Sequence, residues 1–255
     1  MESIAELRKI CQETRDDVLY QSNWFDRNAK RRISIYITKP LLLLGLSANQ
    51  ATLVDLLIGL AAGAFLTSAN PRHWLIGIAL FYLFFVFDCV DGEIARYRKS
   101  SSAEGSYLDG GLGILMWPYI LACMTFGIQS ALQSNIVFAV GFLAAIGWPL
   151  YGVSALLPYP ILHSLGRLQD VVEASDSITE ATAMRWGRTI FGMRGFIPAL
   201  VTVTLVDYLT DPFAVAGFVL NARFVYLALF AGATLAGIVL RTWNMTRHGV
   251  RLVKP

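Results

Sequence analysis

The chain has 255 residues, of which 55% are hydrophobic and only 15% are charged, and its formal net charge is +3. Soluble globular domains carry about 25% charged residues, so this composition argues against an ordinary soluble protein and predicts an integral membrane protein. The three cysteines, Cys11, Cys89 and Cys123, are far apart and form no CxxC pair. This spacing argues against a zinc site or a disulfide framework.

Residues 1–35 begin polar and acidic, without the basic start and apolar stretch of a cleavable signal peptide. The first membrane span must therefore also serve as the insertion signal. Apolar residues alternate with arginines here, and Trp24 and Phe25 can anchor the segment at a lipid surface. We expect an interfacial amphipathic helix on the cytoplasmic side; a plain soluble helix is the alternative.

Six apolar segments follow, each close to the roughly 20 residues that cross a bilayer. All six are predicted to be helical, because an open strand edge leaves backbone groups unpaired in lipid. They cover residues 50–68, 73–90, 110–129, 135–158, 195–211 and 219–241. The predicted fold class is an all-α integral membrane protein with six transmembrane helices preceded by the interfacial helix. Its domains are residues 1–35, the six-helix membrane domain 36–245 and a cytoplasmic tail 246–255.

Lysines and arginines are distributed unevenly between the two sides of this topology. They gather in the N-terminal segment, between the second and third spans, in residues 161–194 and in the tail, whereas the opposite loops hold little beyond Arg72 and Arg223. Basic loops stay in the cytoplasm. The chain is therefore expected to be a multi-pass protein with both termini cytoplasmic.

Three aspartates lie where the second and third spans meet the membrane surface. Asp88 and Asp91 are three residues apart and share a helix face, and Asp109 opens the next span. Two antiparallel helices joined by a short loop are neighbours, so the three carboxylates can converge. A divalent cation removes their mutual repulsion, and oxygen ligands favour Mg²⁺, Mn²⁺ or Ca²⁺. The sequence predicts a metal site; separate aspartates that solvate helix ends are the alternative.

Small and basic residues accompany these aspartates. Gly92 and Ala95 leave the helix surface bare enough for a ligand to approach. Arg96 supplies a planar cationic fork suited to phosphate or carboxylate, and Gly105 lies where the chain turns into the third span. Together these residues indicate a metal–phosphate site at the membrane surface.

The spacing of these residues resembles the signature of the CDP-alcohol phosphatidyltransferases. We call this set the acidic signature: Asp88, Asp91, Gly92, Ala95, Arg96, Gly105 and Asp109. Residues 46–60, with Asn49 and Thr52, also resemble the family at the start of its first span. The resemblance covers roughly residues 30–245 and weakens after the fourth span.

The resemblance implies an enzyme of phospholipid synthesis with six spans. Such an enzyme moves a phosphatidyl or related phosphoalcohol group from a CDP-linked lipid donor to a small alcohol acceptor and releases CMP. It implies Mg²⁺ or Mn²⁺ at the three aspartates and a homodimer in the bilayer. The residues implied to seat the nucleotide are Asn49, Thr52, Gly92, Ala95, Arg96 and Gly105.

One position departs from the family pattern, which continues with a fourth aspartate where this chain has Gly113. In the family that aspartate helps to hold metal and is thought to deprotonate the attacking hydroxyl. A placed base contributes roughly 10²–10⁴-fold to such a step. The chain is then an active variant with a relocated base, an engineered knockout of a normal enzyme, or a degenerate member that binds CDP-lipid or regulates an active partner.

Asp55 is the candidate for a relocated base. It follows Thr52 by three residues and lies on the same helix face inside an apolar span, where an aspartate is costly unless it has a partner. A structural hydrogen bond to a neighbouring helix is the alternative role.

Arg188 and Arg194 precede the fifth span at its expected cytoplasmic end and are candidates for binding an anionic acceptor. The positive-inside bias alone also places arginines there. No nucleic-acid motif is present, and lipid headgroups explain the basic residues. A transporter is disfavoured, because the sequence has no clear pair of broken helices.

Overall fold

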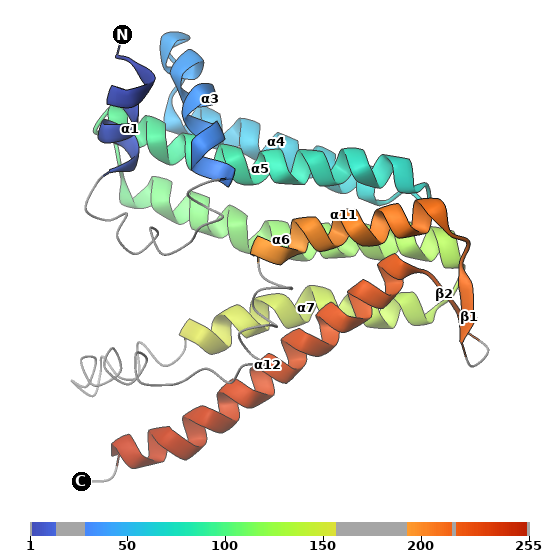
Figure 1. Cartoon of the computed structure of the whole chain (residues 1–255). Coiled ribbons are helices and arrows are strands. Elements are labelled where there is room, and N and C mark those ends of the chain that lie inside the picture. The colour runs from blue at the N-terminus through green and yellow to red at the C-terminus, as the bar shows by residue number, and fades with distance from the viewer. Residues whose placement is uncertain (1, 14–28, 157–192, 216–217, 254–255) are drawn as a thin grey trace. The chain divides into compact units, whose positions relative to one another are not determined.

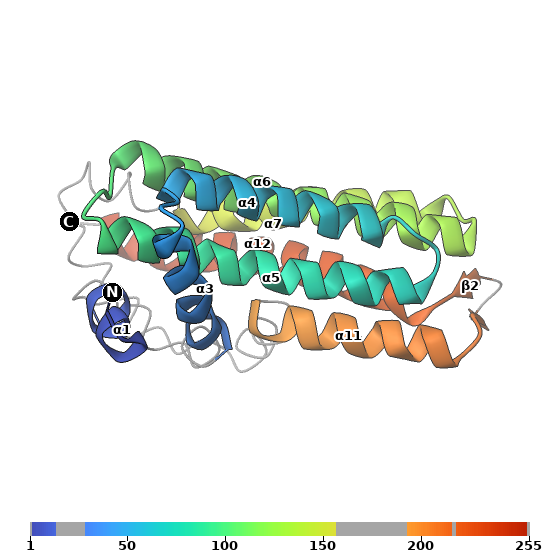
Figure 2. The ribbon, with the colours of Figure 1, turned by 90° about the horizontal axis from the view of Figure 1, so that it is seen from above.

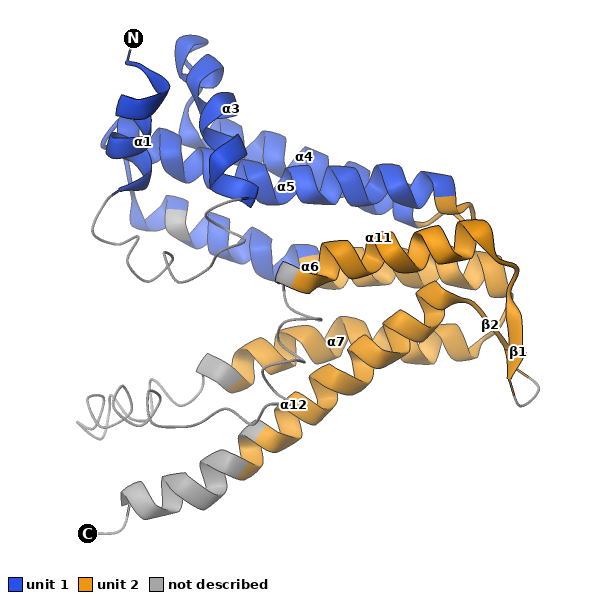
Figure 3. Ribbon diagram, in the orientation of Figure 1, with its two compact units in different colours: residues 1–66, 72–116 blue, residues 67–71, 117–255 orange. Residues whose placement is uncertain are grey.

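The computed structural model describes residues 2–13, 29–156, 193–215 and 218–253, and these are mostly helical (Figure 1). Contacts within the chain divide it into two compact units (Figure 3). Unit 1 consists of residues 1–66 and 72–116, and unit 2 consists of residues 67–71 and 117–255. All three aspartates of the acidic signature, together with Asp55, belong to unit 1.

Unit 1 contains four complete helices and the first part of a fifth. They are α1 (Ile4–Gln12), α3 (Arg31–Leu43), α4 (Ala48–Leu66), α5 (Pro71–Tyr97) and α6 (Ala103–Leu132), of which α6 continues into unit 2. The segment 1–35, expected as one helix, therefore contains α1 and the first turn of α3, which runs on past the expected boundary. Residues 14–28, with Trp24 and Phe25, lie outside the described residues.

α1 is a short helix with a complete N-terminal cap. The backbone N–H of Glu6 donates to Ser3 Oγ, and the Glu6 carboxylate accepts from the backbone N–H of Ser3. This reciprocal capping box satisfies two otherwise unpaired donors. Leu7 and Cys11 of α1 are fully buried against Ile35 of α3, so the two helices pack along one apolar strip.

A tight turn joins α3 to α4. Gly45 adopts a positive φ of 78°, and the backbone N–H of Leu46 donates to the carbonyl of Leu41 at 3.1 Å, as in a Schellman helix end. α4 then begins with another capping box, in which Ser47 and Gln50 exchange backbone-to-side-chain hydrogen bonds. The chain therefore reverses within a few residues and presents the start of α4 to α5.

Small residues let α4, α5 and α6 approach closely. A Cβ atom on Gly59 of α4 would lie 2.6 Å from Met116 Cε of α6, and one on Gly77 of α5 would lie 2.9 Å from the carbonyl oxygen of Ala62. Figure 2 shows α4 and α5 running side by side. Close backbone approach at small residues is the usual way helices pack in membranes.

The end of α5 is a second Schellman turn, but without glycine. The backbone N–H of Ser100 donates to the carbonyl of Ala95 at 2.9 Å. Lys99 occupies the left-handed position with a φ of 52°. The Cβ atom of a lysine is crowded at a positive φ, and glycine has no Cβ atom.

Unit 2 consists of the remaining helices and one small sheet. Its elements are the rest of α6, α7 (Ile136–Leu156), α11 (Met193–Leu209), β1 (Phe213–Val215), β2 (Phe218–Leu220) and α12 (Ala222–Val253). α12 packs along α7 and also contacts α11. A core of aromatic rings joins these helices, with each ring centroid 4.6–5.8 Å from a neighbour: Trp117, Trp148, Phe196, Tyr226 and Phe230.

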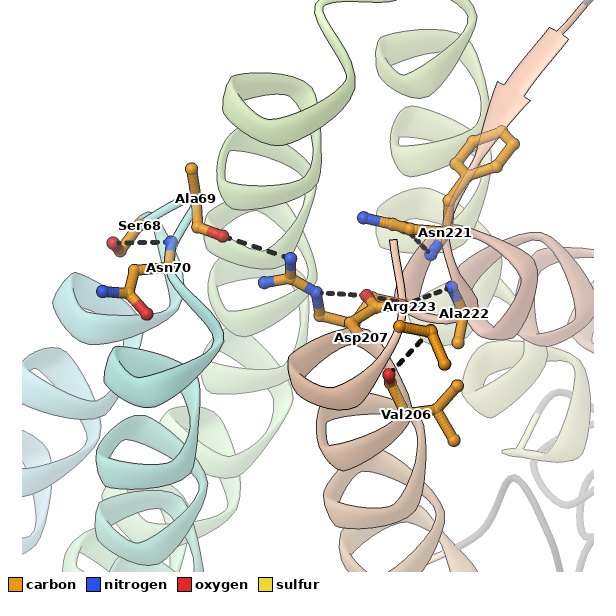
Figure 4. A network of polar contacts seen from close by, with 10 residues as sticks. Ser68, Ala69, Asn70, Val206, Asp207, Asn221, Ala222 and Arg223 are labelled. Atoms are coloured by element: carbon orange, nitrogen blue, oxygen red, sulfur yellow. Dashed lines mark hydrogen bonds and ion pairs between the residues drawn. The ribbon is translucent and has the colours of Figure 1, made fainter. Parts of the chain in front are cut away.

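A buried ion pair holds the connection between α11 and α12 (Figure 4). Arg223 Nε lies 2.6 Å from Asp207 Oδ2, and both side chains are almost fully buried. Asp207 also accepts the backbone N–H of Ala222 at 2.6 Å, and Arg223 Nη2 donates to the carbonyl of Ala69 at 3.1 Å. Removing one partner of such a pair strands a buried charge, so this network fixes the end of α11 against the start of α12.

The membrane-spanning character predicted from composition is present in the helices. Within the described residues, five helices are long and apolar enough to cross a bilayer, in residues 48–66, 71–97, 103–132, 136–154 and 222–240. The predicted fifth span, residues 195–211, corresponds to α11, which has 17 residues and is shorter than these. α12 continues to Val253, so the described part of the expected tail is helical.

The strands β1 and β2 correct the all-α prediction. Phe213 pairs with Leu220 and Val215 with Phe218 in a two-stranded antiparallel sheet. The sequence analysis predicts no strand here, and β2 overlaps the start of the span predicted at residues 219–241. It overlooked the aromatic and branched apolar residues, which favour strands over turns.

The turn after α5 yields a stability prediction. Replacing Lys99 with glycine should raise the free energy of unfolding by about 1 kcal/mol, because glycine adopts a positive φ without the Cβ clash. The opposite substitution, Gly45→Ala, should lower it by a similar amount. Thermal denaturation midpoints of both variants in detergent measure the effect, and a lower midpoint for Lys99→Gly would contradict it.

Candidate active site

Three helices of unit 1 bring four carboxylates near one another. Asp55 comes from α4, Asp88 and Asp91 come from α5, and Asp109 comes from the first turns of α6. Asp55 lies close enough to Asp88, Asp91 and Asp109 to interact electrostatically with each, and Asp109 interacts with Asp88. The aspartates of the acidic signature and Asp55 therefore lie within electrostatic range of one another.

Asp91 is held in place by two donors. It is 5% exposed, and its Oδ2 accepts the Thr52 hydroxyl at 2.7 Å while its Oδ1 accepts the backbone N–H of Gly92 at 2.6 Å. Thr52 thus connects α4 to α5 directly beneath the site. Asn49 lies one turn earlier in α4 and is exposed.

Asp55 has a less favourable environment. Its side chain is 4% exposed, and its Oδ1 is buried without a hydrogen-bond partner among the described residues. It interacts electrostatically with Asp88, Asp91 and Asp109, which carry the same sign of charge. A buried carboxylate in these surroundings needs a proton or a cation.

The donor set fits a hard divalent cation in its chemistry. Carboxylate oxygens are the ligands that Mg²⁺ and Mn²⁺ prefer, and the unpartnered Asp55 oxygen points to missing positive charge. Within the described residues, however, no group of three or more His, Cys, Asp or Glu side chains is already arranged to hold a metal ion. The case for a divalent cation here therefore rests on the negative charge of the carboxylates and on their oxygen ligands.

The start of α6 leaves open space beside the carboxylates. Asp109 is exposed, and a Cβ atom on Gly110, Gly111 or Gly113 would meet no other atom within 4 Å. The departure from the family pattern therefore occurs at a position with room for a side chain. Gly105 lies at the beginning of this helix, where its backbone N–H donates to Ser102 Oγ at 3.0 Å.

The guanidinium of Arg96 lies close to Gly92 on α5. A Cβ atom on Gly92 would lie 3.2 Å from Arg96 Nη1, so the absence of a side chain at Gly92 makes room for the guanidinium. Arg96 Nε donates to the backbone carbonyl of Cys11 at 2.5 Å. Ala95 is half-buried beside them.

The two candidate acceptor residues are not positioned by the structure. Arg188 lies outside the described residues, and Arg194 is the second residue of α11 with a side chain that is likewise not described.

The sequence analysis missed a third acidic residue on α5. Glu93 is completely buried, and its carboxylate accepts from Gln12 Nε2 at 2.6 Å, Ser34 Oγ at 2.5 Å and Thr38 Oγ1 at 2.5 Å. A glutamate inside an apolar helix was a visible signal. Its donors are 55 to 81 residues away in sequence, so no spacing rule could have identified them.

Fold and site together define a multi-pass membrane protein with an acidic site near the ends of its apolar helices. Residues 46–156 match the family model described as CDP-alcohol phosphatidyltransferase. The family identified from the sequence is confirmed over this segment, which spans α4, α5, α6 and α7, and the chain carries a domain of that family. The family transfers substituted phosphate groups and generally depends on divalent metal. A comparison with curated proteins gives no match.

The crowding of carboxylates generates a prediction about metal. In the presence of a chelator, Asp55→Asn should raise the thermal midpoint. The amide replaces a buried carboxylate that lies near three others and whose Oδ1 has no hydrogen-bond partner among the described residues. Added Mn²⁺ should stabilise the unaltered protein, by about 2.7 kcal/mol at a hundredfold excess over its Kd, and should stabilise Asp55→Asn less.

The matched control is Asp211→Asn, which changes an exposed aspartate outside the site. It should leave both the chelator midpoint and the Mn²⁺ response unchanged. Equal Mn²⁺ responses in Asp55→Asn and the unaltered protein would show that Asp55 does not belong to a cation site.

Proposed function

We propose that this protein is a membrane-embedded phosphotransferase that moves a phosphatidyl or related phosphoalcohol group from a CDP-linked donor to an alcohol and releases CMP. The observation that carries the proposal is the convergence of four carboxylates beside an open glycine face of α6, within the matched segment. Phospholipid synthesis is the process that this activity serves.

The acidic signature supplies the donor site. Asp88, Asp91 and Asp109 would hold Mg²⁺ or Mn²⁺, which when bound would neutralise charge on the pyrophosphate of the donor. Thr52 keeps Asp91 oriented through its 2.7 Å hydrogen bond, and Arg96 offers a cation for a phosphate oxygen. The remaining residues of the nucleotide seat are Asn49, Gly92, Ala95 and Gly105.

Asp55 would act as the base that the missing fourth aspartate normally provides. Its carboxylate takes the proton of the acceptor hydroxyl while the hydroxyl oxygen forms a bond to the donor phosphorus. The bond between that phosphorus and the CMP oxygen breaks, and CMP leaves with the electron pair. The unpartnered Asp55 Oδ1 supports this role, because an oxygen without a hydrogen-bond partner is available to receive a proton.

The membrane around the site suggests how the donor and the acceptor would reach it. We infer that the lipid tails of the donor extend sideways between helices into the bilayer and that the alcohol enters from the cytoplasm, where Arg188 and Arg194 would bind an anionic acceptor. α11, at 17 residues, is about 26 Å long and would complete six crossings. Both termini would then lie on one side of the membrane, and the distribution of basic residues favours the cytoplasmic side. A homodimer is part of the same proposal.

A second candidate function rests on Gly113. A family member without a working base would bind a CDP-lipid without turnover, or would regulate an active partner. Binding without CMP release separates this candidate from the enzyme.

The assay that separates the two candidates measures metal-dependent CMP release from CDP-diacylglycerol with a panel of alcohols. The unaltered protein should release CMP with at least one alcohol. Asp55→Asn should reduce the rate by roughly 10²–10⁴-fold, the contribution of a placed base. Gly113→Asp, added to Asp55→Asn, should restore part of the activity, because position 113 has open space for the side chain.

The control for the assay is again Asp211→Asn, with an expected rate equal to that of the unaltered protein. Full activity in Asp55→Asn would remove Asp55 as the base. Donor binding without CMP release from the unaltered protein, across all alcohols, would favour the binding protein over the enzyme.

A further inference from the structure

The last turns of α5 carry a second set of polar contacts, which shares only Arg96 with the acidic signature. Glu93, Arg96 and Tyr97 follow one another at helix spacings i, i+3 and i+4, so they share one side of α5. Each of the three side chains contacts the N-terminal segment of the chain, through Gln12, Cys11 and Glu2 respectively. The last turns of α5 therefore contact the N-terminal segment through residues that include Arg96 of the acidic signature.

The first of these contacts is a buried carboxylate that joins three segments. Glu93 Oε1 accepts from Gln12 at the end of α1 and from Ser34 in α3, while Oε2 accepts from Thr38 one turn further along α3. Gln12 also donates to the carbonyl of Arg31 at 2.8 Å. Hydrogen bonds to a charged acceptor are stronger than those between neutral groups, so Glu93 fixes both helices to α5.

The second contact concerns the orientation of Arg96. The last four carbonyls of a helix have no intrahelical donors, and Cys11 is the penultimate residue of α1. Arg96 Nε donates to the Cys11 carbonyl at 2.5 Å, where the negative end of the helix dipole also attracts the cation. With its Nε edge held by α1, the planar guanidinium places Nη1 over Gly92, within the acidic signature.

We propose that α1 is a positioning element of the donor site: its Cys11 carbonyl orients the Arg96 guanidinium toward an anionic ligand, and Glu93, through Gln12, holds α1 in that position. Glu93 and Gln12 are thus positioning residues that act through Arg96. The identity of the anion as the pyrophosphate of a CDP-linked donor rests on the proposed function; the docking and the orientation of Arg96 do not.

The test uses Gln12→Ala in the full-length protein, because Gln12 is only half-buried and its removal leaves the apolar contact between α1 and α3 intact. The matched control is Arg98→Ala, which removes an exposed cation two residues after Arg96. A third variant, Gln12→Lys, supplies an ammonium that can donate to Glu93 and to the Arg31 carbonyl, and should rescue the docking.

The first measurement tests the docking of α1 through the rate at which a maleimide labels Cys11. The protein carries Cys89→Ser and Cys123→Ser, so that Cys11 is its remaining thiol. Cys11 is fully buried, and burial raises the pKa of its thiol to about 11, so labelling requires α1 to detach. Gln12→Ala should speed labelling about tenfold, as expected for the loss of roughly 1.4 kcal/mol of docking free energy. Arg98→Ala and Gln12→Lys should label at the original rate.

The second measurement tests the positioning of Arg96 by calorimetry in the presence of Mg²⁺. The two probes are inorganic pyrophosphate and CMP. Gln12→Ala should weaken pyrophosphate binding about tenfold, and Gln12→Lys should restore it, whereas Arg98→Ala should not change it. Faster labelling with unchanged pyrophosphate affinity would reduce α1 to a structural role and overturn the proposal. Unchanged labelling in Gln12→Ala would overturn the docking itself.

The two probes also separate this inference from the proposed function. Binding of pyrophosphate but not CMP, with pyrophosphate affinity lowered in Gln12→Ala, would support the positioning role and remove cytidine nucleotides as the ligand. Failure of the unaltered protein to bind either probe would overturn both proposals.

Discussion

Carboxylates buried among apolar helices must be compensated, and α5 meets this requirement in two opposite ways within three residues. Glu93 receives three hydrogen bonds from α1 and α3, so its charge is stabilised within the chain. Asp91 receives two and has like charges nearby, while Asp55 has a buried oxygen without a partner among the described residues. The first arrangement is that of a structural anchor, and the second leaves negative charge for a cation to neutralise. The proposed activity depends on this difference.

The close packing of the helices puts these charges together. Gly59 and Gly77 have no room for a Cβ atom, because the neighbouring helices occupy that space. Gly110, Gly111 and Gly113 have the opposite character, since nothing lies within 4 Å of a Cβ atom there. Glycine therefore serves two purposes in unit 1: it lets α4, α5 and α6 approach one another, and it keeps one face of α6 open beside the carboxylates.

The N-terminal segment has a more specific relation to the site than a general affinity for lipid. α1 ends at the point where its unpaired carbonyls meet Arg96, and the same turn carries Gln12 to Glu93. An amphipathic helix of nine residues is too short to be stable alone in water. Its stability in the protein must come from these contacts and from the apolar packing of Leu7 and Cys11 on α3. Docking and the orientation of Arg96 are for this reason expected to change together.

The sequence by itself determined the membrane class, five of the spans, the family and the acidic residues on α5 and α6. These features are local: an apolar run long enough to cross a bilayer, or aspartates spaced along one helix, can be read without knowing what lies opposite. The same reasoning identified Asp55 as a misplaced charge in an apolar span, but could not tell whether a neighbouring helix satisfied it. It missed the strands β1 and β2, which lie where the last two predicted spans meet.

Only the tertiary structure decided which partner each buried charge has. Glu93 and Asp91 are two residues apart on one helix. Nothing in their spacing shows which carboxylate is stabilised by hydrogen bonds within the chain and which has other carboxylates nearby. The distinction comes from Gln12, Ser34 and Thr38, whose donors reach Glu93 from distant parts of the chain, and from Thr52, which reaches Asp91. Hydrogen bonds of this kind depend on how helices pack against one another, and that packing is a property of the folded chain.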